Sequence, residues 1–234
     1  MKDINSIAVL SKSDLFKVYI KNNCQDDILT AYAKECNLVL LDEMYGLGFG
    51  ANNNYLYNYV KTNGLLQDDD FIIVLNPDIY IDSSTLFELI SRATLDAVSF
   101  ATINLYKDIN YSFYDNSIRK WPTLLSFVTS FLIGKNNTII DKNLIDEPVY
   151  VDWAAGSFLA IKSSVYNSVN GFDESYFMYC EDVDICYRIN KIGIKLRYYP
   201  DLKALHLAAH KNRNIFSKHF FWHVKSIIRF LMKR

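Results

Sequence analysis

Strand-length apolar runs alternate with helix-length segments along this chain, and that order is the feature that most constrains its fold. The clearest run is FIIVL at residues 71–75, which is apolar throughout, as in a buried strand, and ends at Asn-Pro-Asp. Further strands are expected at residues 16–20, 38–41, 98–103, 150–153, 156–161 and 195–199, and helices at residues 27–35, 55–61, 85–93, 181–192 and 216–232. This alternation predicts an α/β fold with a mostly parallel sheet flanked by helices and with ligands at the carboxyl ends of the strands.

Charge is distributed unevenly, although the net charge of the 234 residues is only −1. Residues 202–234 contain eight Lys or Arg and no Asp or Glu, so this segment carries +8 and the rest of the chain −9. We therefore divide the chain into a body, residues 1–201, and a basic, aromatic C-terminal segment, residues 202–234. The charge predicts an anionic surface or ligand for that segment alone. Nucleic acid is not an expected partner, because the body is acidic and no recognition motif is present.

Cysteine usage and hydropathy bear on the compartment. The four cysteines show neither CxxC pairing nor a zinc-site spacing, which favours free thiols in a reducing, cytosolic compartment. The N-terminal apolar run IAVL is far shorter than the h-region of a signal peptide. No segment approaches the ~20 apolar residues that a membrane-spanning helix needs. We therefore expect a cytoplasmic protein whose contact with a membrane, where there is one, is peripheral.

Asn76-Pro77-Asp78 follows the clearest predicted strand. Pro77 fixes the backbone and donates no hydrogen bond, so the sheet is expected to stop there and to present the Asp78 carboxylate at its edge. A hard divalent cation that binds a diphosphate takes one or two protein carboxylates besides phosphate oxygens and water. Asp78 suits that role, although Asn-Pro-Asp is also a favourable turn sequence without any ligand.

A second group of carboxylates, Glu181, Asp182 and Asp184, begins the helix predicted at residues 181–192. Acidic side chains at a helix N-terminus are stabilised by the helix dipole, which is a sufficient structural explanation. The functional alternative is a general base that removes a proton from an acceptor hydroxyl. Tyr179, in the aromatic run YFMY just before the helix, would then belong to a platform for the acceptor.

Three weaker signals accompany these motifs. Trp153 precedes Gly156 by three residues, a pairing that suits the stacking of a sugar ring and equally a buried Trp beside a tight bend. The loop GLGFGANNN at residues 46–54 lets the backbone approach a ligand and offers three Asn side chains, but it matches neither GxGxxG nor a P-loop. His206 follows the last predicted strand, where it either completes a cation site with Asp78 or is an ordinary surface or core histidine.

Taken together, these segments resemble the rhamnosyltransferase branch of glycosyltransferase family 2. Its members are inverting enzymes of the Rossmann-like GT-A fold that build bacterial O-antigen, lipopolysaccharide and related polysaccharides. The resemblance runs from about residue 16 to the C-terminus and implies a metal-dependent hexosyltransferase. The matching segments are YGLGFGANNN, FIIVLNPDI, VDWAAGSFLAIK and VNGFDESYFMYCEDVDICYRINKIGIKLRYYP with the following LKALH.

The resemblance also implies roles for individual residues. Asp78 would be the Mg²⁺ or Mn²⁺ ligand of this branch's DxD-like motif, with His206 as a further ligand. Asp182 would be the catalytic base, paired with Glu181. Residues near the nucleotide sugar would be Asn22, Gly48, Gly50, Asn53, Asn76 and Asp78, and residues bordering the acceptor and sugar pocket would be Trp153, Gly156 and Tyr179.

The implied substrates place the protein at a membrane. The donor would be a dTDP-L-rhamnose-like nucleotide sugar, and the acceptor a saccharide joined by a diphosphate to a lipid on the inner face of the cytoplasmic membrane. The C-terminal FSKHFFWHVKSIIRFLMKR, at residues 216–234, would contact that membrane as an interfacial helix. The alternative is a solvated helix docked on the body.

One departure from the family concerns the N-terminal part. Only five residues separate IAVL from FKVYI, whereas a parallel crossover needs at least ~10–12 residues, so the family's first strand is expected to be missing. Asn22 also stands where the family commonly has an Asp that contacts the base. A second hypothesis is therefore a truncated, inactive relative that acts as a binding partner in a polysaccharide-assembly complex.

Overall fold

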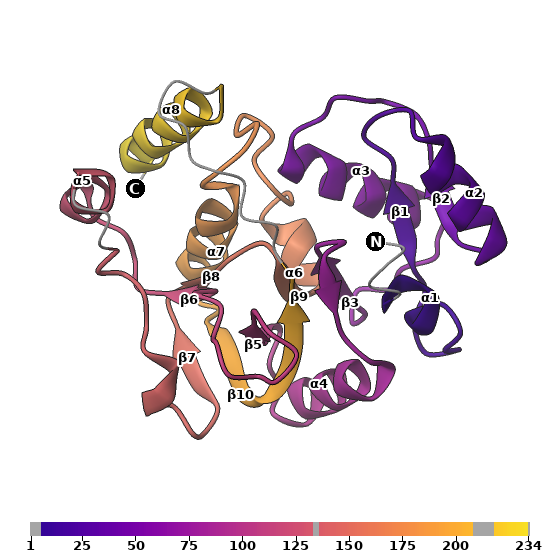
Figure 1. Ribbon diagram of the computed structural model, residues 1–234, viewed down its shortest axis with the longest axis horizontal. Coiled ribbons are helices and arrows are strands. Elements are labelled where there is room, and N and C mark those ends of the chain that lie inside the picture. Colours follow the sequence, from indigo (N-terminus) through magenta and orange to yellow (C-terminus); the bar gives the residue numbers. More distant parts are fainter. Residues whose placement is uncertain (1–5, 133–135, 208–217, 234) are drawn as a thin grey trace.

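The computed structural model describes residues 6–132, 136–207 and 218–233. At its centre lies a six-stranded sheet with helices around it (Figure 1). The strands of its main path, in spatial order, are β3 (Phe71–Leu75), β9 (Phe158–Lys162), β5 (Phe100–Tyr106), β10 (Leu196–His206) and β4 (Ile79–Tyr80), and β7 (Val149–Val151) pairs with β10 off this path. The strand predicted at residues 71–75 coincides with β3.

This sheet is mixed, which corrects the prediction of a mostly parallel one. β5 and β10 are parallel, whereas β9 runs antiparallel to both β3 and β5. β4 and β7 run antiparallel to β10. An apolar run of strand length indicates that the strand is buried on both faces, but it does not indicate the direction in which the strand runs. The antiparallel orientation of β9, which is inserted between β3 and β5, could therefore not be predicted from its sequence. Because β3, β5 and β10 point the same way, their carboxyl ends share one edge of the sheet.

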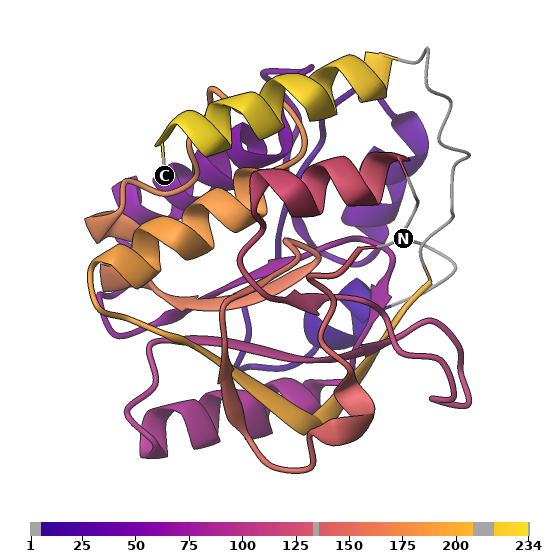
Figure 2. The same ribbon diagram turned by 90° about the vertical axis from the view of Figure 1, so that its left-hand side faces the viewer.

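Helices cover both faces of the sheet. Successive residues of β9 point to opposite faces, so Leu159 lies in one core cluster and Ala160 in the other. α6 (Ser163–Ser168) and α7 (Glu181–Lys191) pack on the first cluster, and α4 (Ser83–Leu95) packs on the second. Figure 2 shows α7 and α4 on opposite sides of the sheet.

The N-terminal elements form a unit of their own beside β3. β1 (Tyr19–Lys21) and β2 (Val39–Leu41) pair in parallel, connected by α2 (Asp27–Glu35). α2 coincides with the predicted helix because Asp26 caps it, accepting hydrogen bonds from the backbone of the next turn. The IAVL run lies in a helix, α1 (Ser6–Leu10), and no strand precedes β1 within the residues that the structure describes.

Two element boundaries differ from the prediction. α3 (Phe49–Thr62) starts inside the segment predicted as a loop, because Gly48 is its N-cap and the asparagines lie in its first turns. β10 continues through Pro200, where the predicted strand ended. The pairing of β10 with β5 shifts register between Tyr199 and Lys203, and such an irregularity accommodates a residue without an N–H group.

The segment between β5 and β9 builds a lobe at the side of the sheet. Within it β6 (Ile118–Arg119) pairs with β8 (Trp153–Ala154). The lobe also contains α5 (Leu124–Leu132) and a 3₁₀ turn (Lys142–Leu144).

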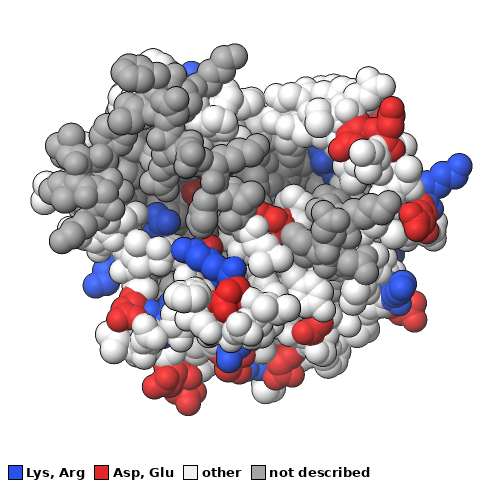
Figure 3. All heavy atoms as spheres, in the orientation of Figure 1, with Lys and Arg blue, Asp and Glu red and all other residues white. Residues whose placement is uncertain are grey.

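The C-terminal helix α8 (Lys218–Lys233) lies beside α5 in both ribbon views (Figures 1 and 2). The first two residues of the helix predicted at residues 216–232 lie outside the described residues. No helix in the described part of the chain is long and apolar enough to cross a membrane. On the face drawn in Figure 3, acidic and basic side chains of the described residues are interspersed rather than gathered into one patch.

Candidate functional site

Asp78 lies in a tight turn between β3 and β4, at the carboxyl end of β3. The turn is held by the backbone N–H of Asn76, which donates to Ser157 O at 2.9 Å. β4 then pairs antiparallel with the end of β10, so that His206 lies opposite Ile79. This register brings Nε2 of His206 to 3.5 Å from Oδ1 of Asp78. The two residues that were predicted to share a cation are therefore neighbours.

Asp115 is a third member of this group, and no motif in the sequence pointed to it. It lies in the loop after β5, and its Oδ2 is 2.9 Å from Nδ1 of His206. The side chains of His206 and Asp115 are only 12% and 15% exposed. Although burial opposes the charged form, hydrogen bonds to Asp115 and Asp78 raise the pKa of His206 to about 9. The bond to His206 lowers the pKa of Asp78. Burial would raise the pKa of Asp115, but the hydrogen bond to His206 and the charges of His206, Lys142 and Lys107 together lower it.

The arrangement of this group fits a divalent cation with few protein ligands. Oδ1 of Asp78 is buried, and apart from the long 3.5 Å contact with Nε2 of His206 it has no hydrogen-bond partner among the described residues. Because Asp115 holds Nδ1 of His206, the imidazole presents Nε2 on the side of Asp78. In the described ranges, no three or more His, Cys, Asp or Glu side chains are arranged to hold a metal ion together. A carboxylate oxygen and one imidazole nitrogen, which would bind the ion in place of its proton, would leave the remaining coordination positions to phosphate oxygens and water.

The acidic pair begins α7 after a turn of unusual backbone conformation. Tyr179 and Cys180 have φ angles of 71° and 63°, in the left-handed region that non-glycine residues rarely adopt. Asp182 then accepts hydrogen bonds from the N–H of Gly156 at 3.2 Å and of Val183 at 2.9 Å. A Cβ on Gly156 would lie 3.0 Å from the Phe49 ring and 3.4 Å from Cβ of Asp182. The absence of a side chain at Gly156 therefore permits its backbone to reach the carboxylate.

Burial perturbs both acids of the pair. Burial, and then the charge of Asp182, raise the pKa of Glu181 to about 8, and burial also raises the pKa of Asp182. A carboxylate with a raised pKa is a stronger base near neutral pH. Asp184 differs, because its Oδ2 accepts from Nε of Arg188 at 2.7 Å. It is therefore engaged in a structural ion pair.

The cation group and the acidic pair are linked by short backbone contacts. The N–H of Asn76 bonds to Ser157, and the neighbouring residue Gly156 bonds to Asp182. Trp153 lies nearby and is buried, with Nε1 donating to Lys120 O at 2.9 Å. The guanidinium carbon of Arg119 lies 5.3 Å from the Trp153 ring centroid.

The predicted donor residues lie toward β1 and α3. Asn22 is buried, and its Nδ2 donates to Oδ1 of Asp42 at 2.8 Å. A Cβ on Gly48 would overlap the carbonyl oxygen of Phe177, and one on Gly50 would come within 2.7 Å of Cβ of Phe172. These glycines thus allow α3 to approach the segment that precedes the acidic pair. The Asn53 side chain donates to the backbone O of Phe49 at 2.9 Å, within its own helix.

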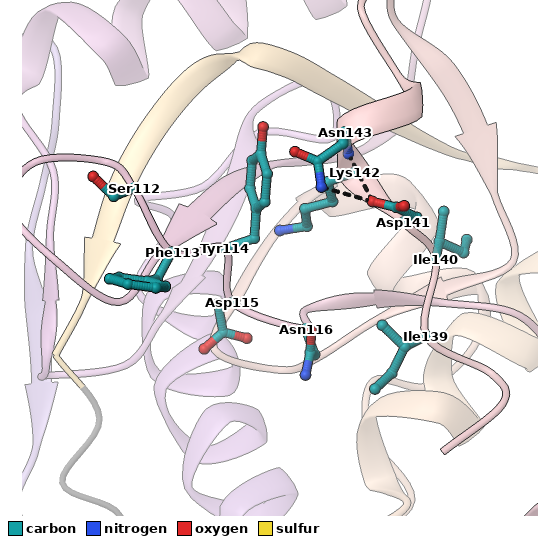
Figure 4. A pocket seen from close by; sticks show the side chains of 10 residues that line it. All are labelled: Ser112, Phe113, Tyr114, Asp115, Asn116, Ile139, Ile140, Asp141, Lys142 and Asn143. Carbon is teal, nitrogen blue, oxygen red and sulfur yellow. Dashed lines mark hydrogen bonds between the residues drawn. The ribbon is translucent and has the colours of Figure 1, made fainter. Parts of the chain in front are cut away.

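A pocket of about 420 Å³ lies beside the cation group (Figure 4). It is lined by residues 112–116 and 139–143 and includes Asp115. Lys142 is buried in its wall, where Nζ donates to Ser117 Oγ at 2.9 Å and Asn104 Oδ1 at 3.1 Å. Burial lowers the pKa of Lys142 to about 7.

Known proteins with similar sequences decide the family. No protein-family model matches the chain. It is 41% identical over 221 residues to the rhamnosyltransferase WbbL of Escherichia coli (strain K12), a match that covers 94% of this chain and 83% of that protein. The chain belongs to the rhamnosyltransferase branch of glycosyltransferase family 2.

A second rhamnosyltransferase is more distant. The N-acetylglucosaminyl-diphospho-decaprenol L-rhamnosyltransferase of Mycobacterium tuberculosis (strain CDC 1551 / Oshkosh) is 32% identical over 209 residues, which are 85% of this chain and 68% of that protein. The predicted family is therefore confirmed, and with it a glycosyltransferase.

Solved structures confirm the GT-A fold of this rhamnosyltransferase family member. GalNAc-T7 with UDP, GalNAc and Mn²⁺ superimposes with a TM-score of 0.63 at 15% identity and covers 92% of this chain, which spans only 41% of that one. The mannosyltransferase PcManGT from Pyrobaculum calidifontis, in complex with GDP-Man and Mn²⁺, gives a TM-score of 0.59 at 13% identity over 96% of this chain and 59% of that chain.

Proposed function

We propose that this chain transfers L-rhamnose, with inversion, from a dTDP-L-rhamnose-like nucleotide sugar to a lipid-diphosphate-linked saccharide in O-antigen or related cell-surface polysaccharide synthesis. The observation that carries the proposal is the Asp182 carboxylate, held by the backbone of Gly156 next to the turn that contains Asp78. The names of the two rhamnosyltransferase relatives support the sugar, and the mycobacterial name supports a lipid-diphosphate acceptor.

A single base suffices for inversion. The acceptor oxygen attacks the anomeric carbon on the face opposite the leaving diphosphate, and the bond from that carbon to the diphosphate oxygen breaks as the new bond forms. Asp182 takes the proton of the attacking hydroxyl. Gly156 N–H keeps the Asp182 carboxylate in place without covering it with a side chain.

The leaving group requires positive charge. Mg²⁺ or Mn²⁺, when bound, would neutralise the charge that builds on the diphosphate. Asp78 and His206 would hold that ion, and Asp115 would keep the imidazole oriented through Nδ1. The Mn²⁺ in two solved structures of the same fold supports this choice of ion.

The remaining predicted residues divide between the two substrates. We assign the nucleotide side to the residues near β1, α3 and the end of β3, namely Asn22, Gly48, Gly50, Asn53 and Asn76. We assign the acceptor side to Trp153, Gly156 and Tyr179, which lie around the acidic pair.

The outer face of α8 supports a peripheral position on the inner face of the cytoplasmic membrane. Phe221, Val224, Ile228 and Met232 recur every three or four residues and are exposed, between 37% and 82%. Together with the excess of basic residues in the segment 202–234, such a helix suits the interface of an anionic bilayer.

Donor binding and transfer test this function separately. Calorimetry with Mn²⁺ and dTDP-rhamnose should show binding, and the purified protein should transfer or hydrolyse the sugar. Asp182→Asn should abolish transfer and leave donor binding intact, whereas Asp146→Asn, at an exposed acidic residue in the lobe, should change neither. Absence of donor binding by the wild-type protein with and without metal would contradict the enzyme and favour an inactive partner in a polysaccharide-assembly complex.

A further inference from the structure

The inner face of α8 contacts four consecutive residues of the segment before the acidic pair, which we call the base loop (residues 176–179). Its contacts come from each turn of the helix. Lys233 Nζ lies 5.6 Å from the ring centroid of Tyr176. The ring centroids of Trp222 and Phe177 are 4.6 Å apart, and Ser226 Oγ donates a hydrogen bond to Met178 O at 3.0 Å. The Tyr179 hydroxyl lies 3.1 Å from Nδ1 of His219. One helix therefore contacts all four residues of the base loop.

The base loop leads directly into the acidic pair through a strained turn. Tyr179 and Cys180 both have positive φ angles, a backbone conformation that persists only where the surroundings enforce it. Tyr179 is packed against the His223 ring of α8 at 4.9 Å, and the Cys180 side chain is buried. Glu181 is the next residue, so any shift of the turn moves the start of α7.

The same loop also touches the segment assigned to the nucleotide. The N–H of Phe49 donates to the backbone O of Phe177 at 3.2 Å. Phe177 thus lies between α3 on one side and Trp222 of α8 on the other. A displacement of Trp222 would therefore shift Phe177 and act on both the base loop and the start of α3.

α8 also contacts the body of the protein outside the base loop. Phe230 is buried in the first core cluster, 5.9 Å from the ring of Tyr187, and that contact anchors the helix to the body. Trp222 and His219 lie two turns or more away from that anchor and meet the base loop. Anchoring and contact with the loop are therefore carried by different residues of the helix.

We propose that α8 is a positioning element for catalysis, in which Trp222 and His219 hold the base loop so that Glu181 and Asp182 enter the site in the required orientation. The catalytic consequence rests on the proposed function of Asp182. The structural part does not, because it concerns only whether the base loop keeps its conformation when the contact with α8 is lost.

Cys180 provides a readout that is independent of activity. Its thiol is buried at the end of the base loop, while Cys186, one turn and a half into α7, is also buried and serves as an internal reference. Iodoacetamide labelling followed by peptide mapping should show Cys180 modified at least about tenfold faster in Trp222→Ala than in the wild type, with Cys186 unchanged. Phe221→Ala, which removes the adjacent outward-facing ring, should leave the labelling of Cys180 unchanged.

The kinetic arm distinguishes positioning from stability. Trp222→Ala should lower kcat of transfer by about 10–100-fold, because a small displacement of a catalytic group has an effect of that size, and Trp222→Phe should restore most of it. His219→Ala, at an exposed position, should also lower kcat, because the Tyr179 hydroxyl loses its contact with Nδ1 of His219.

Two results would overturn the proposal. One is equal acceleration of Cys180 and Cys186 labelling, which would mean general loosening of the fold. The other is continued protection of Cys180 in both Trp222→Ala and His219→Ala. If instead the labelling behaves as expected but the wild-type protein transfers no sugar, the positioning of the loop stands and the proposed function fails.

Discussion

Protein without bound metal is expected to lose stability as the pH rises through the titration of His206. The pKa of this imidazole is raised from 6.5 to about 9 in the folded state, so its proton stabilises the fold. That contribution is fully present below pH 6.5, the ordinary value, and disappears as the pH rises through about 9. At about 1.4 kcal/mol per pH unit the difference corresponds to about 3 kcal/mol. Solvent screening reduces it little, because the side chain is only 12% exposed.

The measurement is urea unfolding of the wild type and of His206→Gln in EDTA, from below pH 6.5 to above pH 9. Glutamine retains a donor but does not titrate, so the quantity of interest is the difference between the two unfolding free energies. Glu181 and Lys142 also titrate in this window, with pKa values of about 8 and about 7. Both are present in the two proteins, and their contributions largely cancel in the difference.

The expected result is a difference in unfolding free energy that falls by about 3 kcal/mol across the window. Two parallel stability curves would refute the reasoning, since they would show that the Asp78–His206–Asp115 contacts do not retain the proton. The absolute stability of the variant is not the test, because leaving two carboxylates without their partner is itself destabilising.

Four other changes probe the same centre and the helix beside it. Asp115→Asn should weaken Mn²⁺ binding by about 10–100-fold, because the imidazole loses its orienting carboxylate; titration followed by electron paramagnetic resonance measures this without turnover. Glu181→Gln should retain most transfer activity, in contrast to Asp182→Asn, when both are assayed with saturating donor. Gly156→Ala should lower kcat and destabilise by about 1–3 kcal/mol through overpacking, as seen in activity assays and thermal unfolding. Ile228→Ser should reduce co-sedimentation with anionic vesicles while donor binding in solution stays at the wild-type level.

Local signals account for the parts of the fold that the sequence predicted well. The β3 strand has a continuous apolar run closed by Pro77, and α2 has its cap at Asp26, so neither depends on distant residues. β10 was predicted too short because Pro200 is read locally as an end, whereas a register shift against β5 accommodates it. The reversal of β9 left no local signal, because a strand buried on both faces has the same composition in either direction.

The distinction between local sequence signals and long-range contacts also applies to the site. Asp78, Asp182 and His206 were predicted as site residues because each follows or begins a recognisable element, and the structure places Asp78 beside His206. Asp115 lies in an irregular loop 91 residues from its partner His206, and nothing around it in the sequence marks the contact. Lys142 likewise reaches Ser117 and residues of β5 only through the fold of the lobe.

Glu181 and Asp182, at the start of α7, differ in how well their surroundings stabilise a negative charge. Asp182 accepts two backbone N–H groups, which favour its ionised form, whereas Oε2 of Glu181 is buried and has no partner in the described part of the chain. Neighbouring carboxylates that interact strongly share their protons as a pair. Burial raises the pKa of both acids, and burial together with the charge of Asp182 raises that of Glu181 to about 8. A base must be ionised before the acceptor arrives, and the two backbone N–H donors to Asp182 support the proposal that it is this base. In that proposal Glu181, whose buried Oε2 has no partner in the described part of the chain, is the member of the pair that keeps the proton.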